Sequence, residues 1–329
     1  MAYERIRIGI VGAGSIVRER HLPGLKKIEG VEIVAVCNRT RESGERVASE
    51  FGIPHVLTDW RELVRMEGID AVVIGTHPSL HHPVTLAALE AGKHVFCQAR
   101  MARNLQEARE MHHKAEQSGL KTMVCPSPYG LKGHRTMKRL LAEGYLGDPY
   151  HLVVRSMFDA YADPDSPLHW RQVTEVSGLN TLALGIVVET VHRWFGYAQE
   201  VTALDRLFFP KRRLPDGTGV GDVGRPDSVV VVAKMESGAL ASFFFSGVSR
   251  FAGPSMIEAY GSRGTLRYNL DTDEVEGAQA GDSTLKPIPI PPEEEGGWRV
   301  EEDFIALIRE GRPVDLTTFA EGVKYTEFT

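Results

Sequence analysis

Residues 6–17 read IRIGIVGAGSIV and join a short apolar run to a glycine-rich turn. The run predicts a buried strand, and the stretch after Gly14 predicts a helix. In that setting Gly12 permits a tight turn, Gly14 leaves room for a pyrophosphate against the backbone, and the helix N-terminus offers free N–H groups. The pattern therefore predicts a dinucleotide-binding loop. Val17 stands at the third fingerprint position, where glycine or alanine is usual, so we expect slightly looser packing between helix and strand.

Apolar runs and amphipathic stretches continue to alternate beyond this loop. Continuous runs such as VEIVAV (31–36) and DAVVI (70–74) are typical of strands buried on both faces. Their alternation with helices predicts a parallel sheet wrapped on both sides. Strands dominate the second part of the chain, which one long helix interrupts at about 179–195. We therefore expect an α/β Rossmann domain at 1–125 and an α+β domain with a mostly antiparallel, open-faced sheet at 126–329.

Charge and composition exclude several classes of protein. The 329 residues include 38 Lys and Arg against 44 Asp and Glu, a formal net charge of −6. A mildly acidic chain without long basic runs is a poor candidate for binding nucleic acid or anionic membranes. No apolar run has the roughly 18 residues that a membrane span needs. Cys37, Cys97 and Cys125 lack CxxC spacing and indicate buried thiols in a reducing compartment, so we expect a cytoplasmic protein.

Two further patterns have a simple structural interpretation. The adjacent histidine pairs at 81–82 and 112–113 point apart on a helix, so we expect no metal site. The basic cluster at 211–213 lies between prolines and is interpreted as a solvated loop. The whole stretch from 210 to 226 is long enough to form an arm or lid.

The residues after the second strand bear on the choice of nucleotide. A carboxylate there binds the ribose 2′-hydroxyl of NAD, whereas an arginine accommodates the 2′-phosphate of NADP. This chain has Asn38 and Arg39 and no carboxylate. The pair favours NADP over NAD and leaves both open.

Four stretches together resemble the Gfo/Idh/MocA family, which includes glucose–fructose oxidoreductase and inositol dehydrogenase. They are GIVGAGSIVRERHLPGL (9–25), VEIVAVCNRT (31–40), DAVVIGTHPSLHHPVTLAALEAGKHVFC (70–97) and SGLNTLALGIVVETVHRWFG (177–196). The resemblance implies a nicotinamide cofactor in a cleft and a small carbohydrate-like substrate. It also implies a homodimer or homotetramer built through the open sheet face.

The resemblance also implies which residues bind the cofactor. Ten positions carry over from the family's motifs: Gly12, Gly14, Ser15 and Ile16 at the pyrophosphate, Asn38 and Arg39 at the adenosine ribose, and Thr76, His77, His81 and Gln98 on the following loops.

The chain departs from the family at the groups that handle protons. Members usually carry Glu-Lys-Pro after the fifth strand, and the lysine serves as a proton relay; this chain has Gln98, Ala99 and Arg100. Members also carry Asp and His on the long helix, at the positions that Ala183 and Val187 occupy here. Three acid/base groups are therefore missing together, which makes the chain an atypical member.

Other side chains are candidates to replace them. We expect Tyr129, His169 and Arg171 to be catalytic, because a tyrosine beside a cation or a histidine can carry a proton. Arg100 and Asn180 are the expected substrate-binding residues, Asn180 because helical spacing puts it on the face of Ala183 and Val187.

The sequence thus predicts an NAD(P)-dependent oxidoreductase acting on a sugar, cyclitol or related polyol with a non-standard proton relay. Two alternatives stay open. One is an altered or inactive member that serves as a cofactor- or sugar-binding subunit or sensor. The other is a cofactor-retaining lyase or glycoside-cleaving enzyme.

Overall fold

The computed structural model describes residues 5–125, 131–314 and 317–329. The chain divides into two compact units: Met1–Pro126 with Arg299–Glu327, and Ser127–Trp298 with the last two residues. The sequence predicted a single break after residue 125, so the division differs near the C-terminus. There the buried face of a helix at 300–310 packs against a helix of the first unit. Local periodicity carries no information about such a return of the chain.

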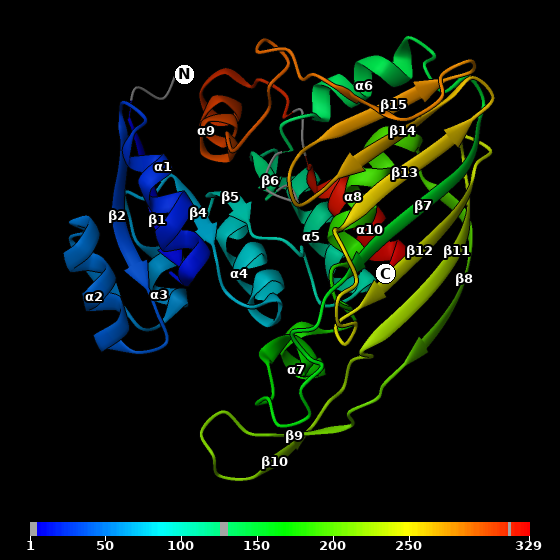
Figure 1. Ribbon diagram of the computed structural model, residues 1–329. Helices are drawn as coiled ribbons and strands as arrows, with labels where there is room; N and C mark the ends of the chain where they lie inside the picture. The colour runs from blue at the N-terminus through cyan, green and yellow to red at the C-terminus, as the bar shows by residue number, and fades with distance from the viewer. Residues whose placement is uncertain (1–4, 126–130, 315–316) are drawn as a thin grey trace. The chain divides into compact units, whose positions relative to one another are not determined.

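The first unit is built on a six-stranded parallel sheet with the order β3-β2-β1-β4-β5-β6 (Figure 1). Its strands are β1 (Ile6–Val11), β2 (Val31–Cys37), β3 (His55–Leu57), β4 (Ala71–Ile74), β5 (His94–Cys97) and β6 (Thr122–Val124). Its helices are η1 (Val17–His21), α1 (Leu22–Lys26), α2 (Arg41–Phe51), α3 (Trp60–Arg65), α4 (Pro78–Glu90), α5 (Leu105–Ser118), α9 (Val300–Glu310) and α10 (Phe319–Phe328, through Glu327). The strand order reverses between β1 and β4, which is where sheets of this kind bind ligands.

Local sequence signals explain most of these boundaries. Asn104 caps α5 by accepting a hydrogen bond from the Glu107 N–H, and Gly119 ends the helix in the left-handed conformation. Asp59 caps α3 in the same way through the Arg61 N–H. The predicted parallel sheet with alternating helices is confirmed, and only the short strand β3 was missed.

The helix that follows β1 is not a regular α-helix. It begins at Ser15, passes through one π-helical turn at Val17–His21 and continues as α1. Val17 is fully buried. Burial of this side chain does not test the expectation of slightly looser packing between helix and strand, which stays a prediction. A Cβ at Gly75 would lie 2.2 Å from Val17 Cγ2, so the glycine after β4 provides the space that the bulkier valine needs.

The second unit is built on an eight-stranded sheet with the order β16-β15-β14-β13-β7-β12-β11-β8. Its strands are β7 (Pro149–Met157), β8 (Ala198–Arg206), β11 (Ser228–Met235), β12 (Leu240–Ser246), β13 (Met256–Gly261), β14 (Gly264–Asn269), β15 (Val275–Gln279) and β16 (Lys286–Ile288). The other elements are the hairpin β9 (Lys211–Arg213) and β10 (Val220–Asp222), and the helices α6 (His134–Ala142), η2 (Trp170–Gln172), α7 (Thr174–Ser177) and α8 (Leu184–Phe195). All neighbouring strands of the large sheet are antiparallel except β7 and β12, which confirms the predicted mostly antiparallel sheet.

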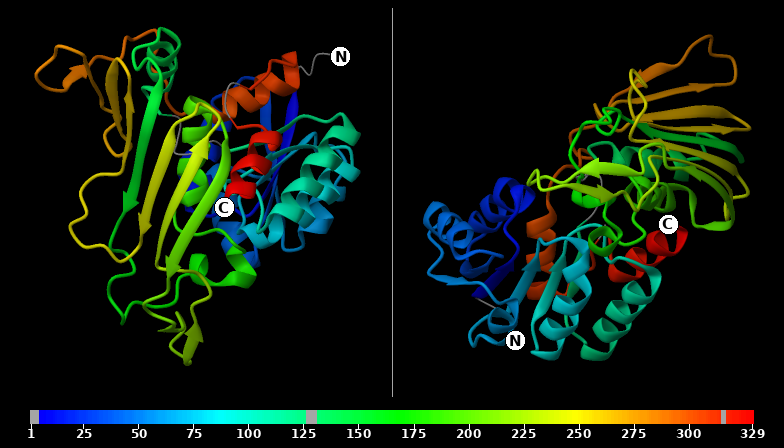
Figure 2. Two further views of the ribbon diagram at one scale, coloured as in Figure 1. Left: turned by 90° about the vertical axis from the view of Figure 1, so that its right-hand side faces the viewer. Right: turned by 90° about the horizontal axis from the view of Figure 1, so that it is seen from below.

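The large sheet has one packed face and one exposed face. Helix α8 buries Val188, Val191 and Phe195 in the same core cluster as inward residues of β11 and β12. The helix itself is labelled beside the sheet in Figure 1. The opposite face, which is turned toward the viewer in the left panel of Figure 2, exposes apolar side chains of β8 and β11, with Leu204 80% exposed. The predicted open-faced sheet is therefore confirmed.

The long helix of the second unit is shorter than predicted. Helix α8 begins at Leu184, whereas the sequence indicated a start near residue 179. Gly178 and Leu182 both have positive φ angles, of 68° and 47°, so the backbone turns twice between α7 and α8. Asn180 lies in this connection and does not share a helical face with Ala183 and Val187.

Two properties of the described residues concern the earlier expectations about compartment. No helix among them combines the length and apolarity needed to cross a membrane. Cys37, Cys97 and Cys125 are all buried, and none of the three belongs to a disulfide. Burial raises the pKa of Cys37 to about 11, so this thiol stays protonated at neutral pH.

Candidate functional site

The carboxyl ends of the central strands of the first unit meet along one edge of its sheet. Gly12 N–H donates to Cys37 O at 2.8 Å, which joins the ends of β1 and β2. Gly75 N–H donates to Val11 O at 2.8 Å, and Gln98 N–H donates to Ile74 O at 2.9 Å. The segments after β1, β2, β4 and β5 are thereby aligned at the point where the strand order reverses.

The two glycines of the loop after β1 have different structural roles. Gly12 has φ +85°, and a Cβ there would lie 2.8 Å from the backbone nitrogen of Thr76, so the turn and the next loop require glycine. Gly14 is exposed, and a Cβ there would meet no atom within 4 Å. The missing side chain at Gly14 thus opens space above the start of the helix, where Ser15 and Ile16 form the first turn. A pyrophosphate fits this arrangement of open backbone and helix N-terminus.

The residue after β2 forms a hydrogen bond to this loop. The Ala13 N–H donates to Asn38 Oδ1 at 2.8 Å, so Asn38 fixes the loop through its side-chain carbonyl. Arg39 is exposed and makes no ion pair within the described part of the chain. Of the two residues predicted at the adenosine ribose, only Arg39 carries a charge, and its side chain is exposed to solvent.

The residues predicted on the loop after β4 divide into accessible and buried ones. Thr76 is half-buried and His77 is exposed. His81 is fully buried: its Nδ1 lies 2.9 Å from Arg100 O, and its Nε2 lies 3.0 Å from Thr76 O. Burial lowers the pKa of His81. This side chain therefore ties two loops together and does not present a free edge to a ligand.

The segment after β5 is also packed into the protein. Gln98 and Arg100 are both buried, and Gln98 Oε1 accepts a hydrogen bond from the Ala99 N–H at 3.1 Å. The methyl side chain of Ala99 has no group that can carry a proton. The Gln98 amide further contacts His21, a residue that the sequence did not single out. No local pattern links His21 to this position, because the two are 77 residues apart.

The candidate catalytic residues belong to the second unit. His169 caps the short helix η2: its Nδ1 accepts from the Arg171 N–H at 3.2 Å, and its own N–H donates to Gln172 Oε1. The Arg171 guanidinium is exposed and lies 4.3 Å from the centre of the Trp170 ring. Tyr129, the third candidate, lies outside the described residues.

The structure adds Tyr161 to this group, which sequence reasoning missed. The Tyr161 hydroxyl lies 3.5 Å from His169 Nδ1, and the two ring centres are 6.1 Å apart. A phenol beside an imidazole is a pair of groups that can share a proton. The eight-residue separation falls in a loop, where no helix or strand period points to a contact.

Arg212 is the second residue that sequence reasoning missed, and its prediction as part of a solvated loop is wrong. It is 2% exposed and donates to the backbone carbonyls of Asp163 at 2.7 Å and Tyr161 at 2.5 Å. The aromatic ring of Phe209 lies 5.2 Å from the guanidinium carbon. The sequence does not distinguish such a buried arginine from a surface arginine, because its hydrogen-bond partners are backbone carbonyls, which every residue has.

The remaining predicted positions, on and before α8, are mostly buried. Asn180 is buried, and its side-chain amide donates to Ser177 O at 2.7 Å. Val187 is 3% exposed and belongs to the apolar core of the second unit, while Ala183 precedes α8 as its N-cap residue. Within residues 5–125, 131–314 and 317–329, no three His, Cys, Asp or Glu side chains are grouped so as to hold a metal ion.

Comparisons with known proteins agree with this architecture. Residues 6–125 match the GFO_IDH_MocA oxidoreductase family with its NAD-binding Rossmann fold, and residues 134–267 match the GFO/IDH/MocA C-terminal domain. The 1,5-anhydro-D-fructose reductase of Ensifer adhaerens is 31% identical over 269 residues, which are 79% of this chain and 74% of the relative. The levoglucosan dehydrogenase of Pseudarthrobacter phenanthrenivorans is 26% identical over 328 residues, covering 88% of this chain and 83% of the relative. A solved levoglucosan dehydrogenase in complex with NADH and levoglucosan has the same fold, with a TM-score of 0.86 at 24% identity, covering 98% of this chain and 94% of that one.

Proposed function

Because the chain belongs to the Gfo/Idh/MocA oxidoreductase family, we propose that it is an NAD(P)-dependent oxidoreductase of a sugar, cyclitol or related polyol. The observation that carries the proposal is the open backbone at Gly14, at the point where the strand order of a Rossmann sheet reverses. Relatives named as reductases and dehydrogenases of sugars and inositol support the substrate class.

In this proposal the backbone of Gly12–Ile16 binds the pyrophosphate, and the segments after β4 and β5 border the nicotinamide half. Thr76 and His77 are the side chains on the β4 loop that are accessible enough to contact a cofactor. His81 and Gln98 act behind this surface by holding the loops in place. The cofactor supplies the hydride chemistry, and the protein supplies orientation and a proton carrier.

We infer a preference for NADP from the end of β2. Asn38 uses its carbonyl oxygen on the Ala13 N–H, and no carboxylate follows it to accept from a ribose 2′-hydroxyl. The exposed Arg39 guanidinium suits a 2′-phosphate, because charge-assisted hydrogen bonds from arginine to phosphate are strong.

For the proton carrier we propose His169, with Tyr161 and Arg171 beside it. Ala99, Ala183 and Val187 stand where the family's proton-handling groups are expected, and none of them can exchange a proton. The Tyr161 hydroxyl at 3.5 Å from His169 Nδ1 supports a role for the pair in proton transfer. Tyr129 and Arg100 remain proposed contributors, to catalysis and to substrate binding.

The test is Gly14→Ala, measured by calorimetric titration with NADPH and NADH. The new methyl group has room in the fold and fills the space proposed for the pyrophosphate, so affinity falls by about 10-fold or more, equal to about 1.4 kcal/mol, with an unchanged melting temperature. Gly219→Ala is the matched control, because a Cβ there also meets nothing within 4 Å. A wild-type protein that binds neither nucleotide, or a Gly14→Ala variant that binds as the wild type does, contradicts the proposal.

Turnover separates the proposed oxidoreductase from its alternatives. Reduction of NADP⁺ by a polyol, lost in His169→Ala, is the expected result. Nucleotide binding without turnover of any sugar or polyol favours a cofactor-binding subunit or sensor. Substrate cleavage with no net change in cofactor absorbance favours a lyase or glycoside-cleaving enzyme.

We further propose that two copies of the chain associate through the exposed face of the large sheet. Leu204, Val230 and Phe244 lie side by side across β8, β11 and β12 in the strand register, and all three are exposed. A contiguous apolar patch of this kind is typical of an interface. Leu204→Lys lowers the molar mass measured by light scattering if the proposal holds.

A further inference from the structure

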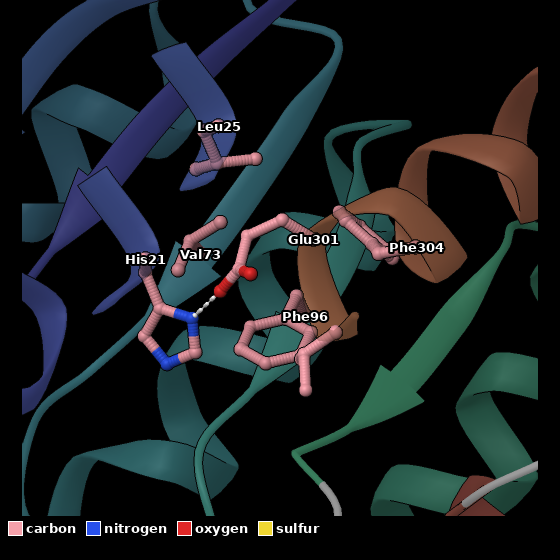
Figure 3. Close-up of a pocket in the computed structure, with 7 residues that line it drawn as sticks. His21, Leu25, Val73, Phe96, Glu301 and Phe304 are labelled. Atoms are coloured by element: carbon pink, nitrogen blue, oxygen red, sulfur yellow. Dashed lines mark hydrogen bonds and ion pairs between the residues drawn. The ribbon is translucent and has the colours of Figure 1, made fainter. Parts of the chain in front are cut away.

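Three buried side chains from distant parts of the sequence form a chain of contacts in the first unit. His21 comes from the π-helical turn, Glu301 from α9, and Gln98 from the segment after β5; they are 1%, 3% and 8% exposed. Glu301 Oε1 contacts His21 Nδ1, and Gln98 Nε2 lies 2.5 Å from His21 Nε2. Figure 3 shows the Glu301 carboxylate aimed at the His21 ring, above Phe96.

The hydrogen-bond pattern fixes the direction of these contacts. Gln98 Oε1 accepts from the Ala99 N–H, so the amide nitrogen of Gln98 is the end that faces His21. His21 Nε2 then accepts this hydrogen bond, and its proton is carried on Nδ1, where it is donated to Glu301. The orientation of the Gln98 amide, and with it the Ala99 backbone, is therefore set by His21 and Glu301.

The surroundings of Glu301 are shaped to receive its side chain. A Cβ at Gly24 would lie 2.7 Å from Glu301 Oε2, so the glycine within α1 provides the space for the carboxylate. The adjoining cavity has a volume of ≈ 10 Å³ and is bordered mainly by apolar groups such as Leu25, Val73 and Phe304. Such surroundings exclude bulk water and strengthen the enclosed hydrogen bonds.

Further contacts hold the same segment from the other side. His81 Nδ1 faces the carbonyl of Arg100, and the Met101 N–H donates to the Tyr325 hydroxyl at 2.6 Å. A Cβ at Gly322 would lie 2.4 Å from Met101 Sδ, so α10 also approaches this segment closely. Residues 98–101 are thus fixed by two helices from the C-terminal part of the chain in addition to the Rossmann strands.

We propose that His21 and Glu301 are positioning residues that set residues 98–100 for the nicotinamide half of the cofactor. The proposal rests on the proposed function, because it assigns these residues to the half of a Rossmann site that β4 and β5 border. It predicts that the C-terminal helix α9 contributes to cofactor geometry although it lies outside the two matched family regions.

The test compares NADPH with 2′-phospho-ADP-ribose, which has the adenosine and pyrophosphate parts but no nicotinamide. In His21→Ala and Glu301→Ala, NADPH affinity measured by calorimetry falls by about 10-fold or more, because binding must then also order a segment that the wild type holds in place. Affinity for 2′-phospho-ADP-ribose stays within about 2-fold of wild type, since the pyrophosphate loop is untouched. Glu301→Gln keeps an oxygen that accepts from His21 Nδ1 and therefore restores most of the NADPH affinity.

Two variants separate positioning from stability. Gly24→Ala keeps all three partners and displaces the Glu301 carboxylate, so it reproduces the selective loss of NADPH affinity. Phe304→Leu alters the same cavity without touching the contacts, so it lowers the melting temperature but leaves the ratio of the two affinities unchanged. Equal losses for both ligands, no loss for either, or failure of both His21→Ala and Gly24→Ala to fold overturns the proposal. If the wild type binds both nucleotides and the variants lose affinity for both equally, the positioning proposal fails and the proposed function stands. If the wild type binds no nucleotide, the proposed function itself is contradicted.

Discussion

The strand ends of the first unit and the 161–180 region of the second unit build their candidate sites in opposite ways. At the strand ends, backbone groups dominate: an open turn at Gly14, a close approach of Gly12 to Thr76, and the start of a helix. In the second region, side chains dominate: His169 beside Tyr161, and Arg212 against backbone carbonyls. The difference teaches that a site made by backbone shape leaves a pattern in the sequence, whereas a site made by side-chain contacts leaves little.

The two glycines of the loop offer the largest test of this contrast. In Gly12→Ala the φ of +85° and the 2.8 Å approach to Thr76 N are both incompatible with a Cβ. We expect the free energy of unfolding to fall by about 3 kcal/mol, the sum of backbone strain and a steric clash. Urea titration measures this loss, and Gly14→Ala, two residues away, serves as the control with wild-type stability. If Gly12→Ala unfolds at the wild-type urea concentration, backbone shape does not define this region.

Arg212 tests the side-chain region next. Arg212→Ala removes a buried guanidinium from the carbonyls of Tyr161 and Asp163, and we expect a loss of about 2 kcal/mol. Arg213→Ala is the matched control. The Arg213 side chain is next in sequence and exposed, so its removal lowers the free energy of unfolding by less than about 0.5 kcal/mol. Denaturant unfolding followed by tryptophan fluorescence gives both values. Equal effects of the two variants would show that the burial of Arg212 contributes nothing to stability.

These cases also show how far the sequence predicts the molecule. The parallel sheet and the glycine-rich turn between the first strand and its helix follow from local patterns of period and residue type, and both appear in the structure. That this turn binds a pyrophosphate stays a prediction. The contact between His21 and Glu301 spans 280 residues, so only the folded chain brings them together. The start of α8 was misplaced for a related reason: Leu182 has a positive φ, which leucine rarely adopts, so the residue type does not signal the turn before the helix.

The next prediction concerns His134, a buried ionisable side chain of the second unit, and the pH dependence of stability. It accepts a hydrogen bond from Trp194 Nε1 at 3.0 Å, and burial lowers its pKa to about 3, with nearby Arg193 adding to the effect. His134 therefore takes up a proton near pH 6.5 in the unfolded state but stays neutral in the folded state at that pH. The contribution of neutral His134 to the free energy of unfolding is complete above pH 6.5 and is lost as the pH falls toward 3. At pH 5.5 the loss is about 1.4 kcal/mol.

The measurement is the urea midpoint of the wild type and of His134→Gln between pH 5 and 7. The glutamine still accepts a hydrogen bond but does not titrate, so the wild type loses more stability on acidification than the variant does. Parallel pH profiles of the two proteins would mean that His134 is protonated as readily in the folded state as in the unfolded chain.

The smallest expected effect concerns Arg39, where the backbone-built site depends on one exposed side chain. Arg39→Ala removes the charge proposed to meet a 2′-phosphate, while the pyrophosphate loop and Asn38 stay intact. NADPH affinity should fall by about 1 kcal/mol, because the pair is exposed to solvent and screened, while NADH affinity and stability stay unchanged. Arg41→Ala is the control, since Arg41 is also exposed but already paired with Glu45. The measurement is fluorescence titration of both nucleotides at low and high salt. A loss of NADPH affinity that disappears at high salt supports the 2′-phosphate contact. An equal change in NADH affinity means that recognition at this end rests on the backbone alone.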